Sequence, residues 1–323
     1  MNKIFAALAT TGLLICGTAQ AETKITFAIS TPLGAMGQMS GQRYTDLVNE
    51  KLGDLGSVEY YHSAQLGPDK DLMQKLKLGS VQLTHMASVM PNYVPETAIF
   101  EMPFLVKDRA HVKAIGGQWL QDRMVPAFEA QGYKLIAFWE NGFRHISNDR
   151  HPIVTPDDLA SVKIRTPNSR WRAEMFRTFG ANPTPMPFSE VFIGLQTGAI
   201  DGQENPLVHM SANRMDEVQD YLSLSGHVYS PVFLLTTTRQ WEAWPEEVRT
   251  ILSKTAQEIL PWIYDTMDEA DERLVGELEG RGMEVNTVDR DAFVAASAPV
   301  YEIFDQEIDG GKAMIQEVLE LGN

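Results

Sequence analysis

The sequence predicts an α/β protein made of two lobes, each built around a parallel-type sheet. Strand-like and helix-like segments alternate along the chain, the pattern of parallel strands joined by right-handed crossovers. Two extended stretches, near residues 140 and 232, are placed to pass between the lobes as hinge strands. A helical pattern runs from Pro245 to Gly280 and could reach roughly 50 Å, which is long enough to span both lobes.

Most of the chain before residue 142 is assigned to the first lobe. Alternating apolar residues predict its strands, and amphipathic stretches that end at glycine predict its helices. A glycine-containing turn at 140–142 follows this block, so the first crossing is placed there. The strands are expected at 24–29, 58–61, 81–84 and 134–139, and the helices at 41–52, 69–78 and 108–131.

Residues 163–206 organise the second lobe. A strand at 163–165 stops at a Thr-Pro pair, because the residue before a proline is pushed away from helical geometry. Asn168 is expected to cap the next helix, which carries large apolar residues at helical spacing. Residues 182–187 contain three prolines and must be extended. A short helix capped by Ser189 then leads to a sharp polar turn at 201–206.

The remaining segments close the two lobes. Residues 232–237 are expected to return to the first lobe as the second hinge strand, and Pro261 should kink the long helix. Residues 291–321 are typical of one or two closing helices. The chain is therefore divided into a first lobe of residues 22–142 plus 231–270 and a second lobe of residues 143–230 plus 271–323.

The first 21 residues have the features of a cleaved export leader. Lys3 gives a positive start, residues 4–17 are apolar, and Ala19-Gln20-Ala21 is a small-x-small cleavage signal, so cleavage is expected after Ala21. The single cysteine, Cys16, lies in this leader, which excludes disulfides and thiol chemistry in the mature chain. No later stretch approaches the roughly 20 apolar residues of a membrane span. The expected compartment is the periplasm, without direct membrane insertion.

Charge and motif content exclude several classes of function. The net charge is −16 with no basic cluster, which argues against nucleic-acid binding. The seven histidines show no zinc-binding spacing, and neither a nucleophile elbow nor a phosphate-binding loop is present. No catalytic residue, metal or cofactor is therefore expected. A periplasmic lyase or hydrolase acting on an organic acid remains the alternative, whereas a sensor would need a signalling segment that the sequence lacks.

The polar turn at 201–206 and the end of the strand at Arg165 mark the candidate binding site. Open α/β sheets bind ligands beyond the carboxyl ends of their strands. Arginine suits a carboxylate because its planar fork makes two parallel charge-assisted bonds. From local sequence alone, Arg165 could equally pair with a surface carboxylate, and Asn205 could serve only the turn.

Four motifs carry a resemblance to a known family: KIRTP at 163–167, DGQENP at 201–206, NGFR at 141–144 and PMPFSE at 185–190. Together they resemble solute-binding proteins of tripartite ATP-independent periplasmic (TRAP) transporters, of the dicarboxylate-binding (DctP) type. The resemblance runs over nearly the whole mature chain. It implies the two-lobed periplasmic-binding-protein fold, with a long helix that spans both lobes, and a partnership with the membrane subunits of a TRAP permease.

The resemblance also implies roles for individual residues. Arg165 would clamp the carboxylate of a small organic acid, Asn205 would support it, Arg144 would be a second ligand-facing arginine and Phe188 an aromatic wall. Sialic-acid-binding relatives carry an acidic residue near the position of Ala87, which argues against an amino sugar acid here. The protein is expected to be a monomer. Further candidates for the pocket are Gln65, Ser88 and Trp139, the last of which could equally fill a core.

Overall fold

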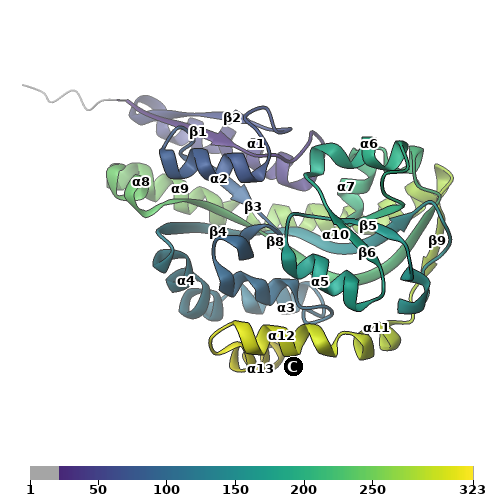
Figure 1. The fold of residues 1–323 in the computed structure, drawn as a ribbon. Coiled ribbons are helices and arrows are strands. Elements are labelled where there is room, and N and C mark those ends of the chain that lie inside the picture. The colour runs from purple at the N-terminus through teal and green to yellow at the C-terminus, as the bar shows by residue number, and fades with distance from the viewer. Residues whose placement is uncertain (1–21, 323) are drawn as a thin grey trace, which may run out of the picture.

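The computed structural model describes residues 22–322, so the predicted leader lies outside the described range. Nine strands form one continuous mixed sheet in the order β2-β1-β3-β8-β4-β7-β5-β6, with β9 beside β8 (Figure 1). The strands are β1 (Thr23–Ala28), β2 (Gly56–Tyr61), β3 (Leu83–Met86), β4 (Tyr133–Asn148), β5 (Lys163–Thr166), β6 (Asn182–Pro185), β7 (Gly202–Asn205), β8 (Tyr221–Thr237) and β9 (Glu284–Thr287).

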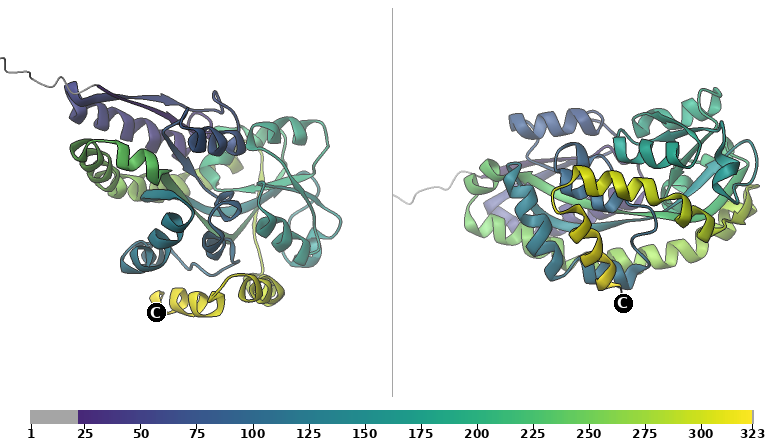
Figure 2. Two further views of the ribbon diagram at one scale, coloured as in Figure 1. Left: turned by 60° about the vertical axis from the view of Figure 1, so that its left-hand side comes forward. Right: turned by 60° about the horizontal axis from the view of Figure 1, so that its bottom comes forward.

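Helices cover both faces of this sheet (Figure 2), so the α/β class expected from the sequence is confirmed. The α-helices are α1 (Met36–Leu52), α2 (Asp69–Leu78), α3 (Arg109–Ile115), α4 (Val125–Ala130), α5 (Arg170–Thr178), α6 (Val191–Gln196), α7 (Leu207–Ala212), α8 (Thr238–Ala243), α9 (Glu246–Glu258), α10 (Leu260–Gly280), α11 (Arg290–Ala296), α12 (Ala298–Glu307) and α13 (Gly311–Leu321). Short helical turns include η3 (Pro95–Glu101), η5 (Pro156–Leu159) and η6 (Phe188–Glu190).

Two long strands join the lobes. β4 and β8 pair antiparallel from one lobe to the other, with β3 beside β8 in the first lobe and β7 beside β4 in the second. The stretch 140–142, expected as a turn, is instead a register shift within β4. Gly142 adopts φ +119°, and a Cβ there would lie 2.7 Å from the methyl carbon of Met267 on α10. The hinge strand therefore bends without leaving the sheet, at a position that requires glycine.

The long helical pattern forms two helices that meet at Ile259. Pro261 stands in the first turn of α10, and because proline lacks an N–H and clashes with the preceding turn, the helix is interrupted between α9 and α10. α9 packs against α1 and β4, while α10 packs against α7 and β9. The kinked helix that spans both lobes is therefore confirmed.

The C-terminal tail forms three helices, α11, α12 and α13, whereas the sequence predicts one or two. Figures 1 and 2 show them in yellow along one side of the sheet. α12 packs against α5 of the second lobe, and α13 packs against α3 of the first. The Tyr301 hydroxyl donates to the Pro103 carbonyl at 2.7 Å, and Trp119 donates to Glu317 at 3.0 Å. The tail thus contacts both lobes, and the lobe boundaries derived from sequence stay a prediction.

Most local signals around the second-lobe strand β5 predict the elements that the structure shows. The N-cap of α5 is Ser169, one residue after the expected Asn168, and its hydroxyl accepts from the Arg172 N–H. Ser189 lies inside the short turn η6 and does not cap α6. The proline-rich strand β6 lies at the edge of the sheet, where its missing N–H groups cost no ladder bonds. No described helix has the length and apolar character that crossing a membrane demands.

Candidate functional site

The cleft between the lobes contains two adjoining cavities. The inner one has a volume of about 80 Å³ and the outer one about 600 Å³. Both are lined by Arg165 and Phe188 from the second lobe and by Ser30 and Asp69 from the first. Ser30 follows β1, Arg165 lies near the end of β5, Phe188 follows β6 and Asp69 begins α2, so the cleft lies at the carboxyl ends of the parallel strands. The inner cavity is also lined by Thr31, His85, Ala87, Ser88, Val89, Asn141, Arg144, Pro167, Asn205, His209 and Val232.

Arg165 is a buried cation, 3% exposed, that faces both cavities. Its Nε and Nη2 donate to the Met186 carbonyl at 3.0 and 2.7 Å, and its guanidinium lies 5.5 Å from the centre of the Phe188 ring. Within residues 22–322 no carboxylate lies at ion-pair distance from it. Burial lowers the pKa of Arg165 to about 9. A buried cation that no carboxylate contacts directly gains strongly from an anion that enters the cleft.

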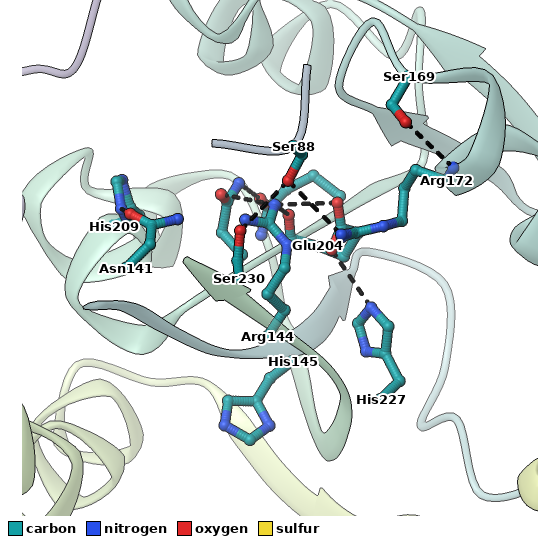
Figure 3. A network of polar contacts seen from close by, with 12 residues as sticks. Ser88, Asn141, Arg144, His145, Ser169, Arg172, Glu204, His209, His227 and Ser230 are labelled. Carbon is teal, nitrogen blue, oxygen red and sulfur yellow. Dashed lines mark hydrogen bonds and ion pairs between the residues drawn. The ribbon is translucent and has the colours of Figure 1, made fainter. Parts of the chain in front are cut away.

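Behind the inner cavity, two arginines converge on Glu204 (Figure 3). Arg144 donates to this carboxylate from Nε at 2.5 Å and from Nη2 at 2.9 Å. Arg172 donates to it from Nη1 at 2.5 Å and to Glu101 from Nε at 3.0 Å. His227 Nε2 lies 3.2 Å from the same carboxylate. Since Glu101 belongs to the first lobe and Glu204 to the second, Arg172 bridges the lobes.

Charges in this network balance one another. Burial alone would raise the pKa of Glu204, but the guanidinium groups of Arg144 and Arg172 hold it well below its usual range. Burial lowers the pKa of Arg144, and Glu204 opposes that shift. Arg144 is therefore already neutralised by a protein carboxylate, whereas Arg165 is not. This difference makes Arg165 the stronger anchor for an anion.

Asn205 is held in place by the same network. Arg144 Nη2 donates to Asn205 Oδ1 at 2.9 Å, and Asn205 Nδ2 donates to Gln203 Oε1 at 2.5 Å. The expected polar turn at 201–206 is largely the strand β7, which lies between β4 and β5. Such a polar strand can be buried because each side chain has a partner; Gln203, for example, donates to Ser147 at 2.8 Å.

Two buried histidines add polar but uncharged surface to the inner cavity. His209 Nε2 lies 2.7 Å from Asn141 Oδ1, and the ring stands edge-on to Phe188 at 5.7 Å. His85 Nε2 lies 3.2 Å from Thr31 Oγ1. Burial lowers the pKa of both imidazoles to about 3, so both are neutral at pH 7. In the described part of the chain, no group of three or more His, Cys, Asp or Glu could hold a metal ion.

Comparison with known proteins places this geometry in a family. The family model of bacterial extracellular solute-binding protein, family 7, matches residues 34–307. The chain belongs to this family. The resemblance derived from the four sequence motifs is therefore confirmed, and a cleft between two lobes is the expected place for the solute of such a solute-binding protein.

Three similar proteins illustrate the likeness of this solute-binding protein to others. It is 34% identical to a solute-binding protein of Verminephrobacter eiseniae, over 93% of this chain and 90% of the relative. It is 30% identical to the 2,3-diketo-L-gulonate-binding periplasmic protein YiaO of Escherichia coli, over 99% of each chain. A TRAP periplasmic solute-binding protein from a Polaromonas species, bound to D-erythronate, superposes with a TM-score of 0.87 at 30% identity and covers 92% of this chain and 98% of its own.

Most of the residues predicted for the site lie together in this solute-binding protein. Arg165, Arg144, Asn205, Phe188 and Ser88 all line the inner cavity. The Ser88 hydroxyl lies 3.3 Å from that of Ser230 and 3.5 Å from Arg172 Nη2. The structure thus supports their predicted neighbourhood, and their contacts with a solute stay predictions.

Two predicted residues lie elsewhere. Gln65 is exposed and lines neither cavity of the cleft. Trp139 is 1% exposed in the hydrophobic core, where it donates to the Ala256 carbonyl at 2.9 Å and stands edge-on to Tyr44 at 5.4 Å. The structure therefore brings neither side chain to the lining of the cleft, and their contacts with a solute stay predictions. Trp139 lies on the face of β4 that α1 and α9 cover, so its side chain is buried in the core instead of facing the cleft.

Sequence reasoning missed other residues that line or support the cleft. Glu204 lies within the DGQENP motif, but the sequence analysis assigns it no role. Its carboxylate is buried, and a buried carboxylate needs a cationic partner, which is the signal that could have marked it. Arg172 recurs with Phe176 and Phe179 at helical spacing, which places it on the buried face of α5. Asp69 and His209 carried no local signal, because only the tertiary fold brings them to the cavity.

Proposed function

We propose that this protein captures a small organic acid anion in the periplasm by closure of its two lobes and delivers it to a TRAP membrane permease. The observation that carries the proposal is Arg165, a buried cation that lines the cleft with no carboxylate of the described chain at ion-pair distance. A ligand carboxylate would contact the guanidinium directly and accept from its Nη1–Nη2 end, because the Nε edge already donates to the Met186 carbonyl.

In this proposal the two lobes close around the bound ligand. A carboxylate bound to Arg165 on the second lobe would offer its remaining atoms to Ser30, Thr31 and His85 on the first, so the closed state gains contacts that the open state lacks. The two lobes already touch across the cleft, where Asn92 Nδ2 donates to the Asn168 carbonyl at 2.7 Å. Bending of β4 at its register shifts would allow this motion.

Several features of the proposal rest on the family and the sequence together. Two of the relatives named above are periplasmic solute-binding proteins, which supports export of this chain, while cleavage after Ala21 rests on the sequence of the leader. Their ligands, 2,3-diketo-L-gulonate and D-erythronate, are organic acids. We further propose that the protein acts as a monomer and returns its ligand chemically unchanged, rather than acting as a lyase or hydrolase.

Two measurements on the mature protein test this function. A thermal-shift screen over hydroxy, sugar, aromatic and dicarboxylic acids should find ligands, because a ligand that binds only the folded state raises the melting temperature. Small-angle scattering with the best ligand should then show a smaller radius of gyration, and mass spectrometry should recover the ligand intact. Absence of compaction would contradict the closure mechanism, and a converted product would support the enzyme alternative.

A further inference from the structure

We propose that the cleft selects singly charged hydroxy acids over dicarboxylates, and that Asp69 is the residue that sets this selectivity. The inference rests on the proposed function and narrows it. It departs from the family resemblance, which is to a dicarboxylate-binding type, and it follows from the charges and hydrogen-bonding groups that line the two cavities of this chain.

Asp69 places a carboxylate opposite the anchor for the ligand. It is the first residue of α2 in the first lobe, and it lines both the inner and the outer cavity together with Arg165 of the second lobe. The Ser30 hydroxyl donates to its Oδ1. Within residues 22–322 this is the one hydrogen bond seen at the Asp69 carboxylate, so Oδ2 is available to accept from a ligand.

Charge at the inner cavity suits one ligand carboxylate and not two. The cationic groups that line it are Arg165 and Arg144, and Glu204 neutralises the latter. Asp69 adds a carboxylate to the opposite wall, and its pKa is raised because burial outweighs the lowering by the Ser30 hydrogen bond and by the charge of Arg165. A ligand carboxylate on Arg165 therefore leaves no uncompensated cation in this cavity for a second carboxylate.

The rest of the inner wall is polar and neutral. Asn141, His209, His85, Thr31 and Ser30 line it, and both imidazoles stay uncharged at pH 7 because burial lowers their pKa to about 3. Hydroxyl groups both donate and accept, so they can satisfy such a wall. A carboxylate only accepts, and it would lose its hydration without gaining a cation.

The outer cavity does not supply the missing cation. Lys70 lines it, but this side chain lies on the exposed part of α2 between Asp69 and Asp71, which line the same cavity. Two carboxylates beside one ammonium leave the outer wall without a net positive charge. A second ligand carboxylate that reaches outward therefore meets Asp69 first.

Matched four-carbon acids test the inference by titration calorimetry on the mature protein at pH 7.5. D-erythronate carries one carboxylate and three hydroxyls, whereas meso-tartrate, which has the same configuration at its two inner carbons, carries two carboxylates and two hydroxyls. Wild type should bind D-erythronate at least about tenfold more tightly, the effect of one like charge within a few ångströms in a partly screened site. Asp69→Asn should reduce this ratio about tenfold, mainly by improving the binding of meso-tartrate.

Asp54→Asn is the matched control, because this exposed carboxylate of the first lobe lines neither cavity. It should leave the ratio unchanged within about twofold, and circular dichroism should show that both variants fold. Equal or tighter binding of meso-tartrate to wild type would overturn the selectivity, and an unchanged ratio in Asp69→Asn would overturn the role of Asp69; either result leaves the proposed function intact. If no organic acid binds to wild type, the proposed function itself fails.

Discussion

Replacing Glu204 by glutamine is expected to lower the free energy of unfolding by about 3–5 kcal/mol, the usual effect of removing one partner from a buried ion pair. Glu204 accepts from Arg144 at 2.5 and 2.9 Å and from Arg172 at 2.5 Å, with all three side chains buried. Glutamine keeps the size and one acceptor but removes the charge. Arg172 would keep Glu101, whereas Arg144 would lose the one carboxylate that it contacts among residues 22–322.

For a chain of this size, about 2 °C of melting temperature corresponds to each kcal/mol, so Glu204→Gln should melt about 6–10 °C below wild type at pH 7. Differential scanning calorimetry of the mature protein measures this shift. Glu284→Gln, at an exposed position on β9, is the matched control and should change the melting temperature by less than about 1 °C.

The pH dependence of this difference gives a second check. In the folded state the pKa of Glu204 is held well below its ordinary value of 4.5. Its contribution to stability is therefore complete above pH 4.5 and is lost as the pH falls further, so the two proteins should converge in acid. A Glu204→Gln variant that melts within about 2 °C of wild type at pH 7 would refute the account of the buried network.

Three other substitutions or conditions test separate parts of the structure. Phe188→Ala should weaken acid binding by about fivefold, because the ring stacks on the guanidinium of Arg165 at 5.5 Å; calorimetry that shows less than a twofold change would contradict this. Gly142→Ala should cost about 1–3 kcal/mol in urea unfolding because alanine is strained at φ +119°. Gly276→Ala, in open space on α10, should be neutral or stabilising, and equal effects would contradict the hinge argument. Stability should fall as the pH drops from 6.5 towards 3, since burial lowers the pKa of His209 to about 3 and protons bind the unfolded chain first. His209→Gln should lose less stability over that range, and an unchanged pH profile would contradict a buried neutral ring.

The sequence was sufficient for the fold class because its local signals agree with the global structure. Alternating strands and glycine-ended helices predicted β1, β2 and α2 close to their observed positions, and Pro261 predicted the kink between α9 and α10. Agreement between local preference and tertiary structure is what makes such signals reliable.

Errors in the fold arose where tertiary contacts override local preference. Residues 202–205, Gly-Gln-Glu-Asn, have the composition of a turn, yet they form a central strand because Arg144 and Ser147 on β4 satisfy their side chains. Residues 140–142 were expected as a turn because they contain glycine, and β4 continues through them with a bulge. In neither case does the local sequence show the strand that pairs with these residues, which is β4 for residues 202–205 and β8 for residues 140–142.

For the site, sequence reasoning found the residues carried by motifs and missed those carried by topology. Arg165 and Asn205 belong to recognisable strings, whereas Asp69 comes from the start of α2, about a hundred residues away, and reaches the cleft only through folding. Trp139 shows the opposite case, since this large aromatic side chain on a hinge strand is buried in the core. Burial, which decides both cases, is a property of the whole fold.

The central claim is that Arg165 binds the carboxylate of the ligand. Titration calorimetry with the tightest acid of the screen tests it on Arg165→Ala, on Arg165→Lys and on the exposed control Arg150→Ala, whose side chain is 61% exposed. We expect a loss of about 100-fold or more for alanine and about tenfold for lysine, because an ammonium cannot make two parallel bonds, and no change for the control. Near-native affinity in Arg165→Ala would contradict the account.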